Sequence, residues 1–357
     1  MYSETDLQAA VDAKVLTPEA ALAFRSHIAS VRAAPGADEE SFRLITGFND
    51  IFVSIAAVIL LMAVGWIGAS IHTALGGAFV AATAWFLAEY FTRKRRMALP
   101  SIVLVLAFAG GVFATMVGFL VEHGEAIFGN RPDETVGAII ISAMALITAG
   151  ATWLHWKRFM VPITVAAGTA ALAATAVALV LAITGMPSPD GTLPMILVLI
   201  AGLGVFMLAM WWDRSDRVRQ TRRSDVAFWL HLLAAPMIAH PIFHLLGVTR
   251  GDDIGSAAAV MVIGVYILFG LIALAIDRRA LLVSALAYVL FAMTQLFNTF
   301  GAVELNVALT AFVIGSALLL LSAFWQNARA TVVGLLPDNL ADQLPATTRS
   351  LSPIPAS

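Results

Sequence analysis

The sequence predicts an all-α integral membrane protein, a bundle of ten transmembrane helices whose N-terminus and C-terminus both lie in the cytoplasm. Three observations favour this class. Of the 357 residues, 60% are hydrophobic and 12% are charged, whereas soluble domains are about 25% charged. Ten apolar segments are each long enough to cross about 30 Å of hydrocarbon as a helix. The basic residues, finally, fall almost entirely in alternate loops between these segments.

The ten segments follow one another between residues 51 and 325, and their continuous apolar runs exclude the alternating pattern of a β-barrel. They are Ile51–Ile71, Ala74–Phe91, Ser101–Val121, Val136–Trp156, Met160–Ile183, Pro194–Trp212, Val226–Leu246, Ser256–Ile276, Leu281–Phe300 and Leu305–Trp325. Glu89 is the one formal charge within them, and Arg93, four residues later, is its expected partner. Because ion-coupled carriers usually keep an ionisable group at mid-membrane, this composition weakens the case for such transport.

Orientation follows from the distribution of lysine and arginine, which are enriched in cytoplasmic loops. With the N-terminus inside, 19 of these residues fall on the cytoplasmic side and two, Arg131 and Arg250, fall on the opposite side. A missed or additional helix would disrupt this alternation. The bias therefore supports both the number of helices and their orientation.

The segments that flank the transmembrane domain at 46–326 have a different composition. Residues 1–45 predict a small cytoplasmic helical hairpin, in which Thr17 caps the second helix and Pro18 occupies its first position. This hairpin is too small to be stable alone, so we expect it to pack on the bundle or to dock a protein partner. Residues 327–357 predict a cytoplasmic tail that begins with a candidate interfacial helix and ends in a disordered Pro/Ser-rich stretch.

Small residues at every fourth position predict two helix-packing faces. The fifth predicted span has a ridge of alanines at Ala166, Ala170, Ala174, Ala178 and Ala182, and the third has Ala107, Gly111 and Thr115. We expect the alanine ridge to face another helix rather than lipid.

The two ends of the chain carry a resemblance. A hairpin-like pair of segments, Asp6–Ala13 and Val15–Ala20, leads into Arg43–Val53, and the cytoplasmic end contains Leu335-Leu336-Pro337 and Gln343-Leu344-Pro345. Together with the many-helix core, this layout resembles a family of predicted bacterial inner-membrane proteins that carry a domain of unknown function. The resemblance implies a multi-pass protein of the inner membrane and brings no activity with it.

Several chemistries are absent from the sequence. Without cysteine there are no disulfides, thiolate metal sites or thiol nucleophiles. The phosphate-binding loop motif, the H-E-x-x-H zinc motif and the G-x-S-x-G nucleophile motif are also missing. A net charge of −2 without a basic tract argues against nucleic-acid binding. We therefore expect no cofactor, and the lipid bilayer as the main surrounding partner.

The seventh predicted span is the most polar of the ten. It contains His240 and His244, which share a helix face, and Pro236 and Pro241, which each disturb a backbone hydrogen bond. His231 lies half a turn away from the histidine pair. Because disturbed carbonyls at membrane depth need protein or water nearby, we expect this helix to be kinked and to line a packed seam or a cavity.

Other polar residues map to the same extracytoplasmic layer. A ligand-binding or sensing site would combine His240 and His244 with Gln295, Asn298 or Glu304. A metal site, which needs three or four ligands, would combine the two histidines with Glu122 or His123. The alternative is that these histidines form hydrogen bonds with neighbouring helices or face interfacial water, and bind no ligand.

Three function classes remain open at this point. The first is a non-catalytic membrane protein that acts as a scaffold, sensor or accessory subunit. The second is a small-molecule transporter built from two five-helix halves. The third, a membrane enzyme or metal site that uses the outer His and Glu residues, has the weakest support, since no catalytic motif accompanies them.

Overall fold

A computed structural model describes residues 7, 10–24, 48–129, 134–185, 191–217, 219, 221–248, 256–299 and 306–345, with only the backbone at 134, 256, 295–299, 306 and 307. The chain divides into two compact units, residues 1–43 and 44–357. Within the described ranges all regular structure is helical, which confirms the predicted all-α class.

The first unit shows the predicted helix start. Residues 18–24 are helical, and the backbone N–H of Ala20 donates to Thr17 Oγ1 at 3.1 Å. Thr17 is therefore the N-cap, as predicted from the Thr-Pro-Glu sequence. Leu7 and Ala21 are the buried apolar residues of the part of this unit that is described.

In the second unit, each predicted apolar segment coincides with a helix. Eight helices in the described residues are long and apolar enough to cross a membrane. They are α3 (Phe48–Ile71), α4 (Thr73–Ala88) with the π-helical η1 (Glu89–Lys94), α5 (Ala98–Phe128), α6 (Glu134–Phe159), α7 (Ile163–Thr184), α8 (Thr192–Arg214), α9 (Arg222–Leu245) and α10 (Ser256–Ile276).

The last helices depart from the simple pattern of straight spans. α12 (Asn306–Ala323) and α13 (Trp325–Gly334) give a ninth candidate only when taken together, and they are bent by 77° relative to one another. α11 (Ala280–Thr299) has a shorter fully described part, Ala280–Thr294, and α14 (Asp338–Ala341) is a single turn. The described chain thus supports a multi-pass membrane protein with eight or nine candidate spans, and the predicted ten stay a prediction.

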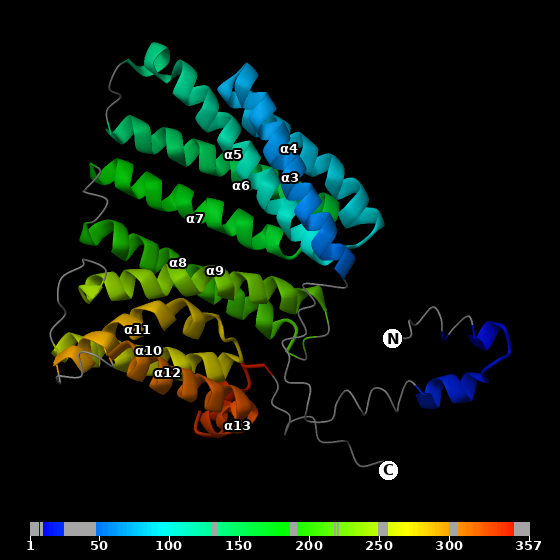
Figure 1. Cartoon of the computed structure of the whole chain (residues 1–357), viewed down its shortest axis with the longest axis vertical. Helices are drawn as coiled ribbons and strands as arrows, with labels where there is room; N and C mark the ends of the chain where they lie inside the picture. Colours follow the sequence, from blue (N-terminus) through cyan, green and yellow to red (C-terminus); the bar gives the residue numbers. More distant parts are fainter. Residues whose placement is uncertain are drawn as a thin grey trace. The chain divides into compact units, whose positions relative to one another are not determined.

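The helices of the second unit lie beside one another largely in chain order, from α3–α5 at one end to α10–α13 at the other (Figure 1). α9 is central: it contacts α7, α8 and α11, and 56% of its apolar window is buried, against 17–39% for the other candidate spans. Both Pro236 and Pro241 lie inside this helix, which continues unbroken through them. The expected packed surroundings are therefore present, without a break in the helix.

Glycines allow α4 and α5 to approach very closely. A Cβ placed on Gly111 would lie 2.7 Å from the Ala81 backbone nitrogen, and one on Gly118 would lie 2.7 Å from that of Ala74. Gly110, next to Gly111, has no such neighbour within 4 Å. The small-residue face predicted for this span is therefore confirmed at Gly111, where only a hydrogen atom fits between the backbones.

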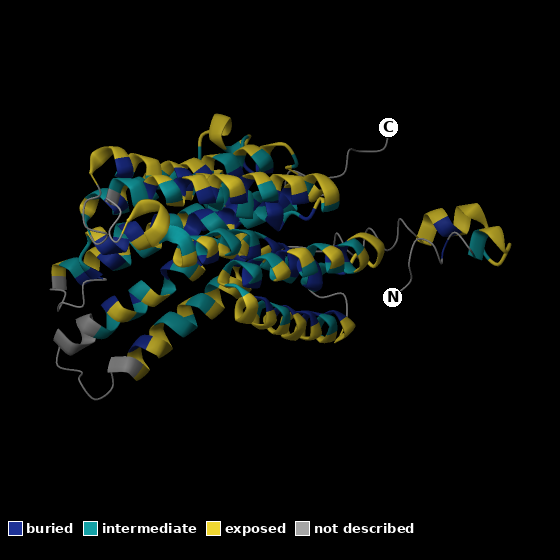
Figure 2. Ribbon diagram, turned by 90° about the horizontal axis from the view of Figure 1, so that it is seen from above, coloured by how far each residue is buried: buried dark blue, intermediate teal, exposed yellow. Residues whose placement is uncertain are grey.

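The alanine ridge of α7 packs only in part. Ala166 and Ala182 are buried, but Ala174, at the centre of the ridge, is exposed. Thr175 occupies the buried position instead, and its hydroxyl donates to the Ala171 carbonyl at 2.9 Å. The prediction that Ala174 faces another helix is wrong, because the buried position at the centre of the helix is Thr175, whose hydroxyl also lies 3.4 Å from the Ser142 carbonyl of α6. Figure 2 shows how buried, intermediate and exposed residues alternate along the helices of the second unit.

The charge at Glu89 is paired within η1 and across to α6. Its Oε2 accepts from Arg93 Nη1 at 3.3 Å, as predicted, and its Oε1 accepts from Arg158 Nε at 2.6 Å. Arg158 was not anticipated as the closer partner, because it lies 69 residues away in sequence.

Candidate functional site

A buried carboxylate lies at the end of α8. Asp213 Oδ2 is 2.9 Å from His231 Nε2 of α9, and Asp213 Oδ1 accepts from Arg278 Nη2 at 2.8 Å. The exposed fractions of the three side chains are 0%, 2% and 5% respectively. Arg278 also donates to the Ser224 carbonyl at 3.1 Å. We call Asp213, His231 and Arg278 the Asp213 cluster.

Local sequence explains how these three residues meet. Asp213 is the penultimate residue of α8, and α9 follows closely and packs along α8. His231 therefore returns to the level of Asp213 after 18 residues. Arg278 lies in the short connection between α10 and α11, at the same end of the bundle. A buried carboxylate is tolerated only when it is paired and hydrogen-bonded, and here both oxygens have partners.

A second carboxylate, Asp277, adjoins the first cluster. Its Oδ2 accepts from Arg219 Nη1 at 2.8 Å, and its Oδ1 accepts from the Trp325 indole N–H at 2.7 Å. Arg329 Nε lies 3.7 Å from the same Oδ1. Arg219 and Asp277 both adopt a left-handed backbone, with φ of 57° and 56°, which non-glycine residues disfavour. We call Asp277, Arg219, Trp325 and Arg329 the Asp277 cluster.

Arg329 and two further arginines bind the end of the described chain. Arg329 Nη2 donates to the Pro345 carbonyl at 2.7 Å, and Arg217 Nε donates to the Leu344 carbonyl at 3.0 Å. Arg214 Nη2 donates to the side chain of Gln343. Residues 325–345, which we call the C-terminal segment, are therefore folded onto the ends of α8 and α10 rather than hanging free.

Burial and neighbouring charges both shift the pKa values of the two groups of this network that lie outside the spans. Burial lowers the pKa of the Arg219 guanidinium, and the nearby Arg278 lowers it further. For Asp277, burial alone would raise the pKa of the carboxyl. Arg219 and Arg329 outweigh that effect, so the pKa of Asp277 lies below its ordinary value.

The predicted pair His240 and His244 lies near the other end of α9. His240 is exposed, and its Nδ1 is 2.7 Å from the Tyr288 hydroxyl of α11. His244 is buried, with its ring centroid 6.2 Å from that of His240. The side chains of Gln295 and Asn298, and the whole of Glu304, lie outside the described residues. The described contact of the pair is thus with α11, through a tyrosine that the sequence did not single out.

Glu122 and His123 are placed near the end of α5, beside the start of α4. Glu122 Oε2 accepts from the Thr73 backbone N–H at 3.2 Å and lies 3.3 Å from His72 Nδ1. The His123 ring stacks on Phe119 at 4.6 Å and on His72 at 5.5 Å between centroids. In the part of the chain described, no group of three His, Asp or Glu side chains is arranged to hold a metal ion. Glu122 instead accepts a hydrogen bond from a backbone N–H group in the first turn of α4.

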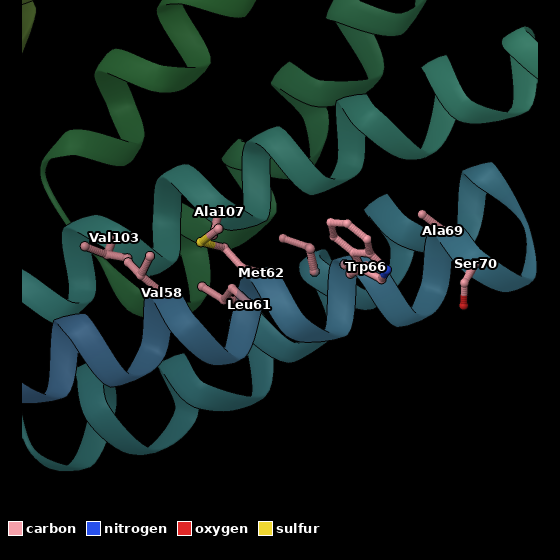
Figure 3. Close-up of a pocket in the computed structure, with 10 residues that line it drawn as sticks. Val58, Leu61, Met62, Trp66, Ala69, Ser70, Val103 and Ala107 are labelled. Atoms are coloured by element: carbon pink, nitrogen blue, oxygen red, sulfur yellow. The ribbon is translucent and has the colours of Figure 1, made fainter.

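Besides these polar groups, two pockets in the described residues are candidate binding sites. The larger, of about 750 Å³, opens between α3, α4 and α5 (Figure 3) and has an almost wholly apolar lining that includes Leu61, Met62 and Trp66. The smaller, of about 150 Å³, lies between α10, α11 and α12 and is lined by Tyr266, Arg279, Leu282, Val283, Leu286, Leu318, Leu321, Ser322 and Trp325. Neither of the two is lined by His240 or His244.

Comparison with known proteins finds no matching family, no matching curated protein and no matching solved structure. The function is therefore argued from the geometry of this chain.

Proposed function

We propose that the chain is a non-catalytic multi-pass protein of a bacterial inner membrane, a scaffold or accessory subunit that presents its ordered C-terminal segment at the cytoplasmic surface. In this proposal all ten predicted helices span the membrane and both termini are cytoplasmic. The distribution of lysine and arginine supports the orientation. A docking role for residues 1–45 remains a prediction beside it.

The observation that carries the proposal is that buried charged residues hold the C-terminal segment in one position. Ion pairs buried in a protein add little net stability compared with apolar packing, but they do fix the position of the segments they join. Here the Asp277 cluster joins α10 to Trp325 and Arg329, and Arg329 in turn holds Pro345. The fastened segment displays Leu335 and Leu340, which are 81% and 48% exposed. A segment held in one position with exposed leucines is suited to contact a partner.

Site-specific photo-crosslinking in living cells tests this role. A photoreactive residue in place of Leu335 should give discrete protein adducts, and these should disappear when Asp277→Ala releases the segment. A photoreactive residue in place of Phe312, which is 72% exposed on α12, serves as the lipid-facing control and should give none. If the adducts at position 335 are unchanged by Asp277→Ala, the anchored segment is not the working surface.

The orientation is tested separately with single cysteines in this cysteine-free chain. An impermeant thiol reagent added outside the cell should label Ser188→Cys and leave Ser215→Cys unmodified. Labelling of position 215 from outside would reject the proposed topology.

Ion-coupled transport is the second candidate, and one observation favours it. Asp213 and His231 lie within two candidate spans and are fully buried, and ionisable groups inside membranes often mark ion pathways. The purified chain in proteoliposomes would then carry a proton flux that Asp213→Asn abolishes and the exposed control Arg223→Gln preserves. Equal, background flux in all three proteins would favour the scaffold role.

A further inference from the structure

The smaller pocket has the features of a lipid site. Its walls are mainly leucines and a valine from α11 and α12, with Tyr266 from α10, while Arg279 and Trp325 lie at the end where α12 bends into α13. The Arg279 guanidinium lies over the Trp325 ring, 4.6 Å from its centroid. An apolar pocket with a cation at its mouth matches the two parts of an anionic lipid, an acyl chain and a phosphate.

We propose that this pocket binds one acyl chain of an anionic phospholipid of the cytoplasmic leaflet, with the phosphate at Arg279. The leaflet assignment rests on the proposed topology. The pocket, of about 150 Å³, has room for a short stretch of one acyl chain.

The charge at this end of the bundle favours an anion over a zwitterion. Residues 213–225, 277–279 and 325–345 contain eight arginines and six aspartates. Asp213 and Asp277, the acidic groups nearest to the α10–α11 connection, are already bonded to Arg278 and Arg219. The excess positive charge and the position of Trp325 beside the bend are typical of the membrane interface on the cytoplasmic side.

Native mass spectrometry of the full chain in detergent tests the proposal, with phosphatidylglycerol, phosphatidylethanolamine and phosphatidylcholine as probes. Phosphatidylglycerol should bind most tightly. Arg279→Gln should weaken it about fivefold, the factor for one interaction of about 1 kcal/mol. Arg223→Gln, an exposed arginine at the same end, is the matched control and should leave the affinity unchanged. Equal weakening by both variants would mean unspecific attraction to charge and would overturn the proposal.

Two further variants separate a lipid chain from a small polar ligand. Leu286→Trp fills the pocket and should abolish tight binding of phosphatidylglycerol. Tyr266→Phe removes a hydroxyl that has no hydrogen-bond partner among the described residues, and it should change nothing, because an acyl chain contacts only the ring. Loss of binding in Tyr266→Phe, or displacement of the lipid by inorganic phosphate alone, would show that the pocket is not an acyl-chain site.

Binding is compared only between variants whose melting temperature equals that of the unaltered protein. If Arg279→Gln unfolds the protein, Arg279→Lys is used in its place. Arg279→Lys should then keep the preference for phosphatidylglycerol over phosphatidylcholine, and its loss despite the retained charge would count against the phosphate contact.

Discussion

The helix pair α4 and α5 and the group α8, α9 and α10 associate by opposite means. Between α4 and α5 the contact positions Gly111 and Gly118 have no side chain, so that one backbone lies directly against the other. Between α8, α9 and α10 side chains with full charges are buried, so that Asp213 reaches His231 and Arg278. In lipid, where apolar burial does little to join helices, close packing and polar contacts are the two available sources of affinity. This chain uses buried charges in only one of these regions, although a glycine, Gly202, also brings α8 close to the backbone of α9 at Met237.

The largest expected effect lies in the charged half. Asp213→Ala leaves Arg278 buried without its carboxylate, and removal of one partner of a buried pair costs about 3–5 kcal/mol. The melting temperature in detergent should fall sharply, whereas the exposed control Asp338→Ala should leave it unchanged. Replacement of the whole cluster by Asp213→Leu, His231→Phe and Arg278→Met should recover most of the loss. A stable Asp213→Ala protein would show that the cluster contributes nothing to the association of these helices.

The glycine-packed half should respond to volume instead of charge. Gly111→Ala forces a methyl group against the backbone of α4 and should destabilise the protein by about 1–3 kcal/mol. Gly110→Ala, one residue earlier on the same helix, meets open space and should be neutral or slightly stabilising. The difference in melting temperature between the two variants measures the close approach directly. Equal values would mean that α4 and α5 can separate at no cost.

A third test concerns the effect of acidic pH on the protection of the C-terminal segment from protease. The pKa of Asp277 is lowered in the folded state, so its stabilising contribution is complete above the unfolded value of 3.8 and is lost as the pH falls through the folded value. The segment should stay protected from an added protease between pH 8 and pH 5, whereas Asp277→Asn should be cleaved near residue 335 at any pH in this range. Cleavage of the unaltered protein at pH 5 would indicate that a group other than Asp277 controls the segment.

The smallest effect is expected at Ala174. Because this residue is exposed on α7, Ala174→Leu should change the free energy of unfolding by less than about 0.5 kcal/mol. Thr175→Leu changes the buried position next to it and is the matched comparison. It should lower the melting temperature clearly more than Ala174→Leu does. A large loss in Ala174→Leu alone would restore the ridge as a contact face.

The sequence predicts the helices better than their contacts. The predicted segments coincide with helices because an apolar run of sufficient length has few alternatives to a helix in lipid. The small-residue spacing also located Gly111 correctly. At Ala174 the same reasoning failed, because small residues on two adjacent stripes of α7 offer a neighbour equivalent surfaces, and the threonine hydroxyl decides between them only in three dimensions.

The Asp213 cluster could not be predicted from the sequence, for a different reason. Asp213 follows directly on the apolar run that ends at Trp212, so it falls just outside the predicted span. His231 was correctly separated from His240 and His244, but a single helix cannot reveal that its partner comes from α8. A lone Asp at the end of one span and a lone His inside the next were the available signal. Arg278 had none, since it stands beside Arg279 in a loop of ordinary composition.

The Asp213 cluster also sets an order of events during synthesis. Arg278 follows Asp213 by 65 residues, and at about 5–20 residues per second the ribosome takes about 3–13 s to deliver it. During this interval the carboxylate at the end of α8 has only His231 to meet it, and α8 and α9 can remain near the insertion machinery until α10 arrives. Arg329, still later in the chain, completes the neighbouring cluster. The C-terminal half therefore reaches its final state only after Arg329 has been made, and a nascent chain arrested before α10 is the form that quality-control proteases should recognise.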